Sequence, residues 1–155
     1  MNAAEGVRRG LIAGAAGVTA LDAITYLDML VRGRPASEVP GRTVNELAKK
    51  IGIDRLDADD EKTTNRRSAT GALVGYADGV LSGVAYGALR SAVRIPWPVG
   101  AALLAGLTLL VGEGSAVRAG VVDWSTWNAQ DWIADLVPRL AYGGVTALTV
   151  EALDA

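Results

Sequence analysis

One uninterrupted apolar run constrains the fold of this chain more than any other feature of its sequence. Residues 95–112 are 18 in number and include no charged side chain, and Pro96 and Pro98 mark the start of the run. As an α-helix the run is about 27 Å long, close to the thickness of the hydrocarbon core of a bilayer. Proline is tolerated in the first turn of a helix. The run therefore predicts a membrane-spanning helix.

Three further apolar segments are interrupted by a few charges. The segments are residues 10–31, 69–90 and 131–151, and the interrupting charges are Asp22, Asp28, Asp78, Asp135 and Arg139. A charge near a helix centre costs about 2.5–3.5 kcal/mol on insertion scales, which a long apolar segment can offset. With the third span taken as residues 95–113, the chain is predicted to be one all-α membrane domain over residues 1–155, a four-helix transmembrane bundle.

The composition favours packed membrane helices over a soluble core. Half of the 155 residues are hydrophobic, yet the aromatic side chains are four Trp, four Tyr and no Phe, whereas Gly contributes 19 residues. Small residues let helix backbones approach each other closely in lipid. The alternative is a soluble, unusually apolar four-helix protein, and the shortage of large core side chains argues against it.

The absence of two residue types narrows the chemistry. The chain has no Cys and no His, and its formal net charge is −2. Disulfides, thiolate or imidazole metal sites and histidine-activated nucleophiles are therefore excluded. There is also no P-loop, dinucleotide-binding fingerprint or nucleophile elbow, and the charge gives no reason to expect nucleic acid as a partner. We expect a non-enzymatic protein with no metal and no cofactor.

A polar insert at residues 32–67 separates the first two predicted spans and carries one short amphipathic helix. Thr43 and Glu46 have the spacing of a capping box, an apolar face follows them, and Gly52 is a stop signal. Eight residues make only about two turns, so this helix needs the membrane surface or the ends of the bundle as support.

The fourth span has a clear start signal. Asn128 is predicted to be its N-cap with Asp131 at the third helical position, and Trp127 and Trp132 have the spacing of a hydrophobic staple. Pro138 lies inside the segment, where it removes one backbone hydrogen bond and should kink the helix.

Five glycines recur every fourth residue in the second span. They are Gly71, Gly75, Gly79, Gly83 and Gly87. On a helix they form one groove without side chains, down which a second backbone can approach. One interpretation is internal packing against the first span, whose small surface includes Gly10, Gly14 and Gly17. The other is a seam between two copies or a docking face for another membrane subunit.

A second candidate site is a polar cluster at membrane depth. Its predicted members are Asp22, Asp78, Arg139, Glu113, Tyr26 and Ser82. Ionisable residues in spans face the interior of a bundle or an aqueous cavity and pair with one another. Pairing of Arg139 with Asp22 or Asp78 would let both charges exist in a low dielectric. The cluster is interpreted either as a buried structural ion pair or as a polar path for a proton, ion or small solute.

Four short strings are specific enough together to compare with known families. They are Thr25-Tyr26-Leu27-Asp28-Met29, Arg32-Gly33-Arg34-Pro35, Asn65-Arg66-Arg67-Ser68 and Val137-Pro138-Arg139-Leu140-Ala141-Tyr142-Gly143. Over nearly its whole length the chain resembles a family of uncharacterised actinobacterial four-helix membrane proteins. High-GC coding is consistent with this, since there are 12 Arg but three Lys. A weaker likeness extends to the YagU-like inner-membrane family. The resemblance implies a multi-pass protein of a bacterial cytoplasmic membrane.

Two functional classes follow from these observations. The first is a structural or accessory membrane protein, surrounded by lipid, that self-associates or joins other membrane subunits. The second is a minimal permease or channel that uses the intramembrane Asp and Arg residues. Four spans would place both termini on one side of the membrane, and we expect that side to be the inside.

Overall fold

The computed structural model describes residues 2–58 and 60–154, and within these ranges the chain is all-helical, as the sequence predicts. The elements are α1 (Ala3–Arg32), α2 (Val39–Lys50), α3 (Glu61–Ala92), α4 (Trp97–Ala119), the 3-10 turn η1 (Trp124–Thr126) and α5 (Ala129–Asp154). Three of them, α1, α3 and α4, are long and apolar enough to cross a membrane. The fourth predicted span falls within α5, which is not among these three.

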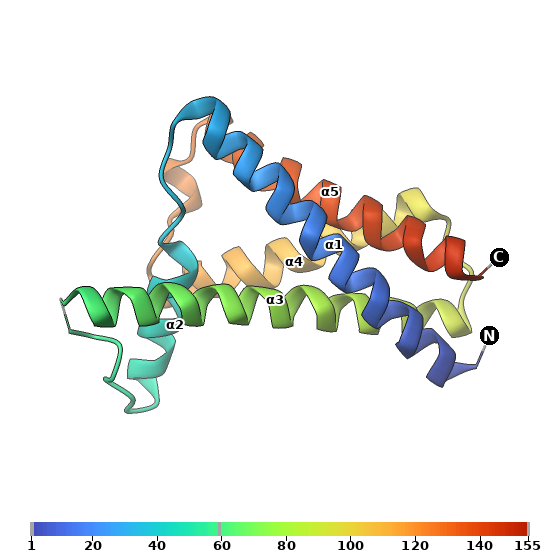
Figure 1. Ribbon diagram of the computed structural model, residues 1–155, viewed down its shortest axis with the longest axis horizontal. Coiled ribbons are helices and arrows are strands. Elements are labelled where there is room, and N and C mark those ends of the chain that lie inside the picture. The colour runs from blue at the N-terminus through green and yellow to red at the C-terminus, as the bar shows by residue number, and fades with distance from the viewer. Residues whose placement is uncertain (1, 59, 155) are drawn as a thin grey trace.

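The four long helices pack together, and the insert lies at one end of them (Figure 1). α1 packs on α3 and α5, α5 packs also on α4, and α2 packs on α3 and α4. Near the chain termini α1 lies against α3, and toward the insert the two helices diverge (Figure 1). Both termini lie at the end opposite the insert.

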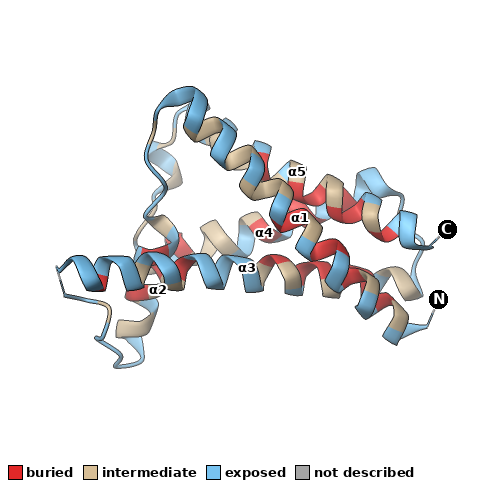
Figure 2. Ribbon diagram, viewed as in Figure 1, coloured by how far each residue is buried: buried red, intermediate tan, exposed pale blue. Residues whose placement is uncertain are grey.

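The buried core consists mainly of small side chains where the long helices cross. Its buried hydrophobic residues are Ala13, Val18, Tyr86, Ala101, Leu104, Tyr142, Ala147 and Val150. Figure 2 shows the buried positions concentrated on the facing sides of these helices. Tyr142 anchors the crossing, since its hydroxyl donates to the carbonyl oxygen of Gly79 at 2.6 Å.

The outer surface of these helices is strongly apolar. Only 28% to 33% of the most apolar stretch of α1, α3 and α4 is buried within the protein. Large side chains such as Leu73, Leu81 and Leu110 are 65% to 70% exposed. Exposure of so many large apolar side chains is uncommon on soluble monomers and is typical of helices whose outer faces contact lipid.

The helices begin earlier than the apolar segments because polar caps set their starts. α1 begins at Ala3 rather than residue 10, and the Asn2 side chain accepts from the Glu5 N–H at 2.8 Å. α3 begins at Glu61 rather than residue 69, with Asp60 as its N-cap. α5 begins as predicted. The Asn128 side chain accepts from the Asp131 N–H at 3.1 Å, and the Trp127 and Trp132 rings pack with centroids 4.8 Å apart.

The helix of the insert is longer than predicted, and its predicted cap is wrong. α2 has 12 residues, Glu38 is its N-cap and Pro40 lies in its first turn. Thr43 is buried inside the helix because this face packs on α3 and α4, so its side chain does not cap the helix. Gly52, with a φ of 79°, ends the turn after α2, as predicted.

Candidate functional site

The glycines at the C-terminal end of α3 pack directly on glycines of α1. A Cβ on Gly83 would lie 2.5 Å from the Cα of Gly14, and a Cβ on Gly87 would lie 2.7 Å from the Cα of Gly10. Gly6, at the start of α1, faces Gly87 and was not part of the predicted surface. The contact is between backbones, so any side chain at these positions must separate the helices.

The other glycines of the series meet different partners. Gly79 faces the side chain of Val18, whereas a Cβ on Gly71 would lie 2.5 Å from the backbone nitrogen of Gly41 in α2. A Cβ on Gly75 would have no atom within 4 Å. Gly17 of α1 faces α5 rather than α3. The predicted single groove is therefore divided among α1, α2 and open surface.

Arg139 pairs with two carboxylates, neither of which is the expected partner. Its Nη2 lies 2.7 Å from Oδ1 of Asp135 and 2.9 Å from Oε1 of Glu113. Its Nη1 also donates to the carbonyl oxygen of Thr108 at 3.2 Å. The three charged side chains are 13% to 16% exposed. The guanidinium lies next to Gly112, since a Cβ on this glycine would be in van der Waals contact with Nη1 at 3.4 Å.

Asp22 and Asp78, the expected partners, lie elsewhere. Asp22 accepts a hydrogen bond from the hydroxyl of Tyr76 at 2.6 Å. Tyr26 is 63% exposed and Ser82 is buried, while Asp78 is half-buried on α3. Of the six predicted cluster members, the structure thus joins only Arg139 and Glu113 by an ion pair. The sequence did not predict Tyr76 as the partner of Asp22. It also did not predict Asp135 as a partner of Arg139, although the i, i+4 spacing of these two residues was a visible signal.

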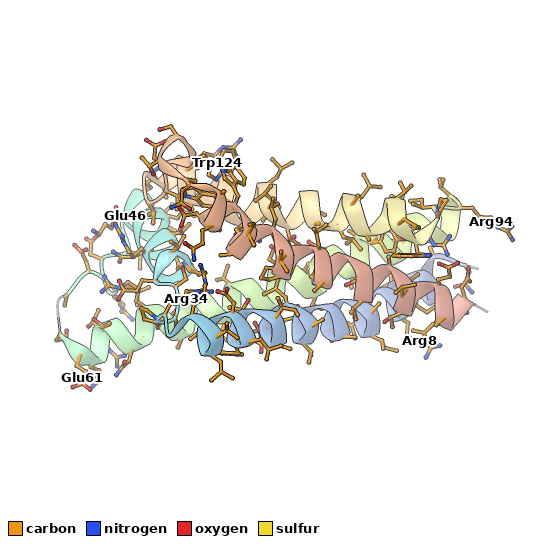
Figure 3. All side chains as sticks on the ribbon, turned by 90° about the horizontal axis from the view of Figure 1, so that it is seen from above. Arg8, Arg34, Glu46, Glu61, Arg94 and Trp124 are labelled. Atoms are coloured by element: carbon orange, nitrogen blue, oxygen red, sulfur yellow. The ribbon has the colours of Figure 1, made fainter. Side chains whose placement is uncertain are left out.

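A cleft of about 400 Å³ opens beside the Arg139 ion pairs. We call it the insert-side cleft, and its charged lining consists of Arg32, Arg34, Glu113, Asp131, Asp135 and Arg139. Trp127, Thr25, Ser37 and apolar residues from α1, α2 and α5 complete its lining. Figure 3 shows Arg34 and Trp124 at the end of the molecule that carries the insert, and Arg8 and Arg94 at the other end.

Charges in the cleft are divided between two walls. Arg32 and Arg34 form the basic wall, and both bind Asp28, at 2.8 Å and 2.5 Å. Glu113, Asp131 and Asp135 face them from α4 and α5 together with Arg139, so this acidic wall has three acids and one base. Among the described residues no ion pair joins the two walls.

The insert is held together by a second polar group, outside the apolar stretches. Lys49 of α2 forms ion pairs with Asp57 and with Glu46, the latter at 3.1 Å. Asn45, which is buried, donates to Asp57 at 3.3 Å. Lys49, and secondly Asn45, lower the pKa of the Asp57 carboxyl below its ordinary value. Lys50 also donates to the carbonyl oxygen of Arg118 at 2.9 Å, which ties α2 to the end of α4.

Neither metal-binding geometry nor similarity to known proteins points to a function. Among the described residues, no group of three or more Asp or Glu side chains could hold a metal ion. No protein-family model, no curated protein and no solved structure matches the sequence. The function is therefore inferred from the residues and their geometry.

Proposed function

We propose that the protein is a multi-pass protein of a bacterial cytoplasmic membrane, with α5 as a fourth span beside α1, α3 and α4. Asp135 and Arg139 are the two charges inside the apolar part of α5, the one long helix that is not among the three apolar enough to span. They lie 2.7 Å apart on one helix, and Glu113 of α4 is the third member of the group. Charges paired in this way can be accommodated at membrane depth. The resemblance to actinobacterial four-helix membrane proteins also supports this topology.

Within the membrane we propose a non-enzymatic structural or accessory role, in which the protein self-associates or joins other membrane subunits. The observation that carries this proposal is an uncovered face on α4. Gly106 and Gly114 have no atom within 4 Å of a Cβ position, and with Ala102 and Leu110 they form a face of i, i+4 spacing. Leu110 is 66% exposed. Ala102 and Gly106 are small residues at this spacing, which lets a helix of a second protein approach in lipid, and Leu110 next to them can pack on that helix.

The test is the oligomeric mass of the detergent-solubilised protein and the set of proteins that co-purify with it from its native membrane. Gly106→Leu should abolish the complex and leave the protomer folded, because no other helix of the protomer lies within 4 Å of a Cβ at this position. Gly144→Leu is the matched control, since Gly144 of α5 is also uncovered. If Gly106→Leu retains the wild-type mass and partners, the α4 face contacts lipid only and the proposal fails.

A minimal permease or channel is the second candidate, and the insert-side cleft is the observation in its favour. The cleft reaches Glu113 and Arg139, but Asp22 and Asp78 are not among its lining residues. Since Arg139 is already paired, the structural role is favoured. Flux of protons or small solutes into liposomes that contain the purified protein would support the permease, provided that Glu113→Gln abolishes it. Wild-type liposomes as tight as empty ones would exclude it.

A further inference from the structure

Opposite charges face each other across the insert-side cleft without joining. Arg32 and Arg34 each have five N–H donors, and no more than two of each reach a protein acceptor. On the acidic wall, Oε2 of Glu113 and Oδ1 of Asp131 accept no hydrogen bond from the described residues, although Oε1 and Oδ2 of the same carboxylates do. The cleft thus presents free donors on one side and free acceptors on the other.

The net charges of the two walls are also complementary. Counted as formal charges, Arg32 and Arg34 with Asp28 leave one positive charge, and Glu113, Asp131 and Asp135 with Arg139 leave two negative charges. A ligand that carries only one sign of charge would satisfy one wall and be repelled by the other. A ligand with both signs would satisfy the two walls together.

The position of the cleft near the membrane–water interface indicates which kind of zwitterion it can meet. The cleft lies at the insert end of the long helices, where Trp124, Trp127 and Trp132 gather, and tryptophan is enriched at the membrane–water interface. Arginine guanidinium groups bind phosphate oxygens with two parallel hydrogen bonds, and carboxylates accept from an ammonium group. A volume of about 400 Å³ lies within the range of small-ligand sites.

We propose that the insert-side cleft binds a zwitterion with a phosphate and a primary ammonium group. The phosphate lies against Arg32 and Arg34, and the ammonium lies against Glu113 and Asp131. The same chemistry is found in free phosphoethanolamine and in the headgroup of phosphatidylethanolamine. The proposal concerns binding in the cleft, so it holds or fails independently of assembly through α4.

The test uses the full chain in detergent and isothermal titration with phosphoethanolamine, ethanolamine and inorganic phosphate. Phosphoethanolamine should bind at least about tenfold more tightly than either fragment, since it alone satisfies both walls. Arg34→Gln and Asp131→Asn should each weaken it about tenfold. The side chain of Asp131→Asn keeps a carbonyl oxygen that can accept from the Asn128 N–H, as Oδ2 of Asp131 does, so the start of α5 is preserved. Arg55→Gln, at an exposed arginine elsewhere in the insert, is the matched control and should bind as the wild type does.

Several results would overturn the proposal. Phosphate binding as tightly as phosphoethanolamine would reduce the cleft to an anion site, and equally tight ethanolamine binding would reduce it to a cation site. Absence of binding, or wild-type affinity in both Arg34→Gln and Asp131→Asn, would also refute it. A second arm distinguishes the two sources. If nanodiscs of phosphatidylethanolamine block phosphoethanolamine binding and nanodiscs of phosphatidylglycerol do not, the ligand is the lipid headgroup; binding in both nanodiscs identifies the free solute.

Discussion

At the residue scale, the close approach of the α1 and α3 backbones depends on Gly83, because backbone atoms of α1 occupy the space that a side chain at this position would need. Gly83→Ala should lower the melting temperature of the protein in detergent, since overpacking of this kind costs about 1–3 kcal/mol. Gly75→Ala is the matched control, with no neighbour within 4 Å. It should be neutral or slightly stabilising, because alanine is favoured over glycine in helices by about 0.5–1 kcal/mol. Equal melting temperatures for the two variants would contradict the packing described for α3.

Also at the residue scale, we expect Arg139 to stabilise the protein because its charge neutralises Glu113 and Asp135. The packing of its side chain should matter less. Arg139→Gln leaves Glu113 and Asp135 together without a cation, and breaking a buried pair in this way costs about 3–5 kcal/mol. The triple change of Arg139, Glu113 and Asp135 to Leu removes all three charges and should recover most of the melting temperature. A triple variant as unstable as Arg139→Gln would mean that side-chain shape, and not charge, matters at this position.

At the scale of the element, the start of α3 depends on a titratable cap. Asp60 accepts from the Thr63 hydroxyl at 2.7 Å and from the Thr63 N–H at 3.0 Å. These bonds lower the pKa of Asp60 below its ordinary value of 3.8. Because the folded pKa is below that of the unfolded chain, the stabilisation is present above the unfolded value and is lost as pH falls through the folded value.

The Thr63 amide chemical shift measures this cap directly. In the wild type it should move with a midpoint below pH 3.8. In Asp60→Asn, which retains a capping acceptor without a titrating group, it should stay unchanged over the same range. A midpoint at or above 3.8 in the wild type would show that the carboxylate form of Asp60 is not favoured by the cap.

At the scale of the whole molecule, the number of spans determines on which side of the membrane each end of the chain lies. Four spans, with α5 included, place the insert and the C-terminal end of α5 on opposite sides, and three spans place them on the same side. The chain has no cysteine of its own, so single cysteines introduced at Ala58 and Ala152 report their positions cleanly. With the termini inside, an impermeant maleimide should label Ala58→Cys on intact cells and Ala152→Cys only after permeabilisation. Labelling of both on intact cells would show that α5 does not cross.

Local patterns in the sequence were sufficient to predict several elements. The charge-free run at residues 95–112 predicts α4, and the Pro96–Pro98 signal locates its start, because hydropathy and proline stereochemistry act within one helix. Asn128 predicts the start of α5 for the same reason. Starts outside the apolar stretches were predicted less well: Asn2 and Asp60 extend α1 and α3 beyond the hydrophobic segments.

Only the tertiary structure decided which side chains meet. Asp135 could have been found as the partner of Arg139 from its i, i+4 spacing, whereas Glu113 comes from another helix, and its pairing depends on how α4 and α5 are rotated about their axes. Likewise, the glycine spacing predicts a smooth face on α3 but not that α1 covers Gly83 and Gly87 while Gly75 stays open. Periodicity specifies the faces of a single helix. The crossing of α1 over α3, and the insert-side cleft between α1, α2, α4 and α5, arise from contacts between helices far apart in the sequence.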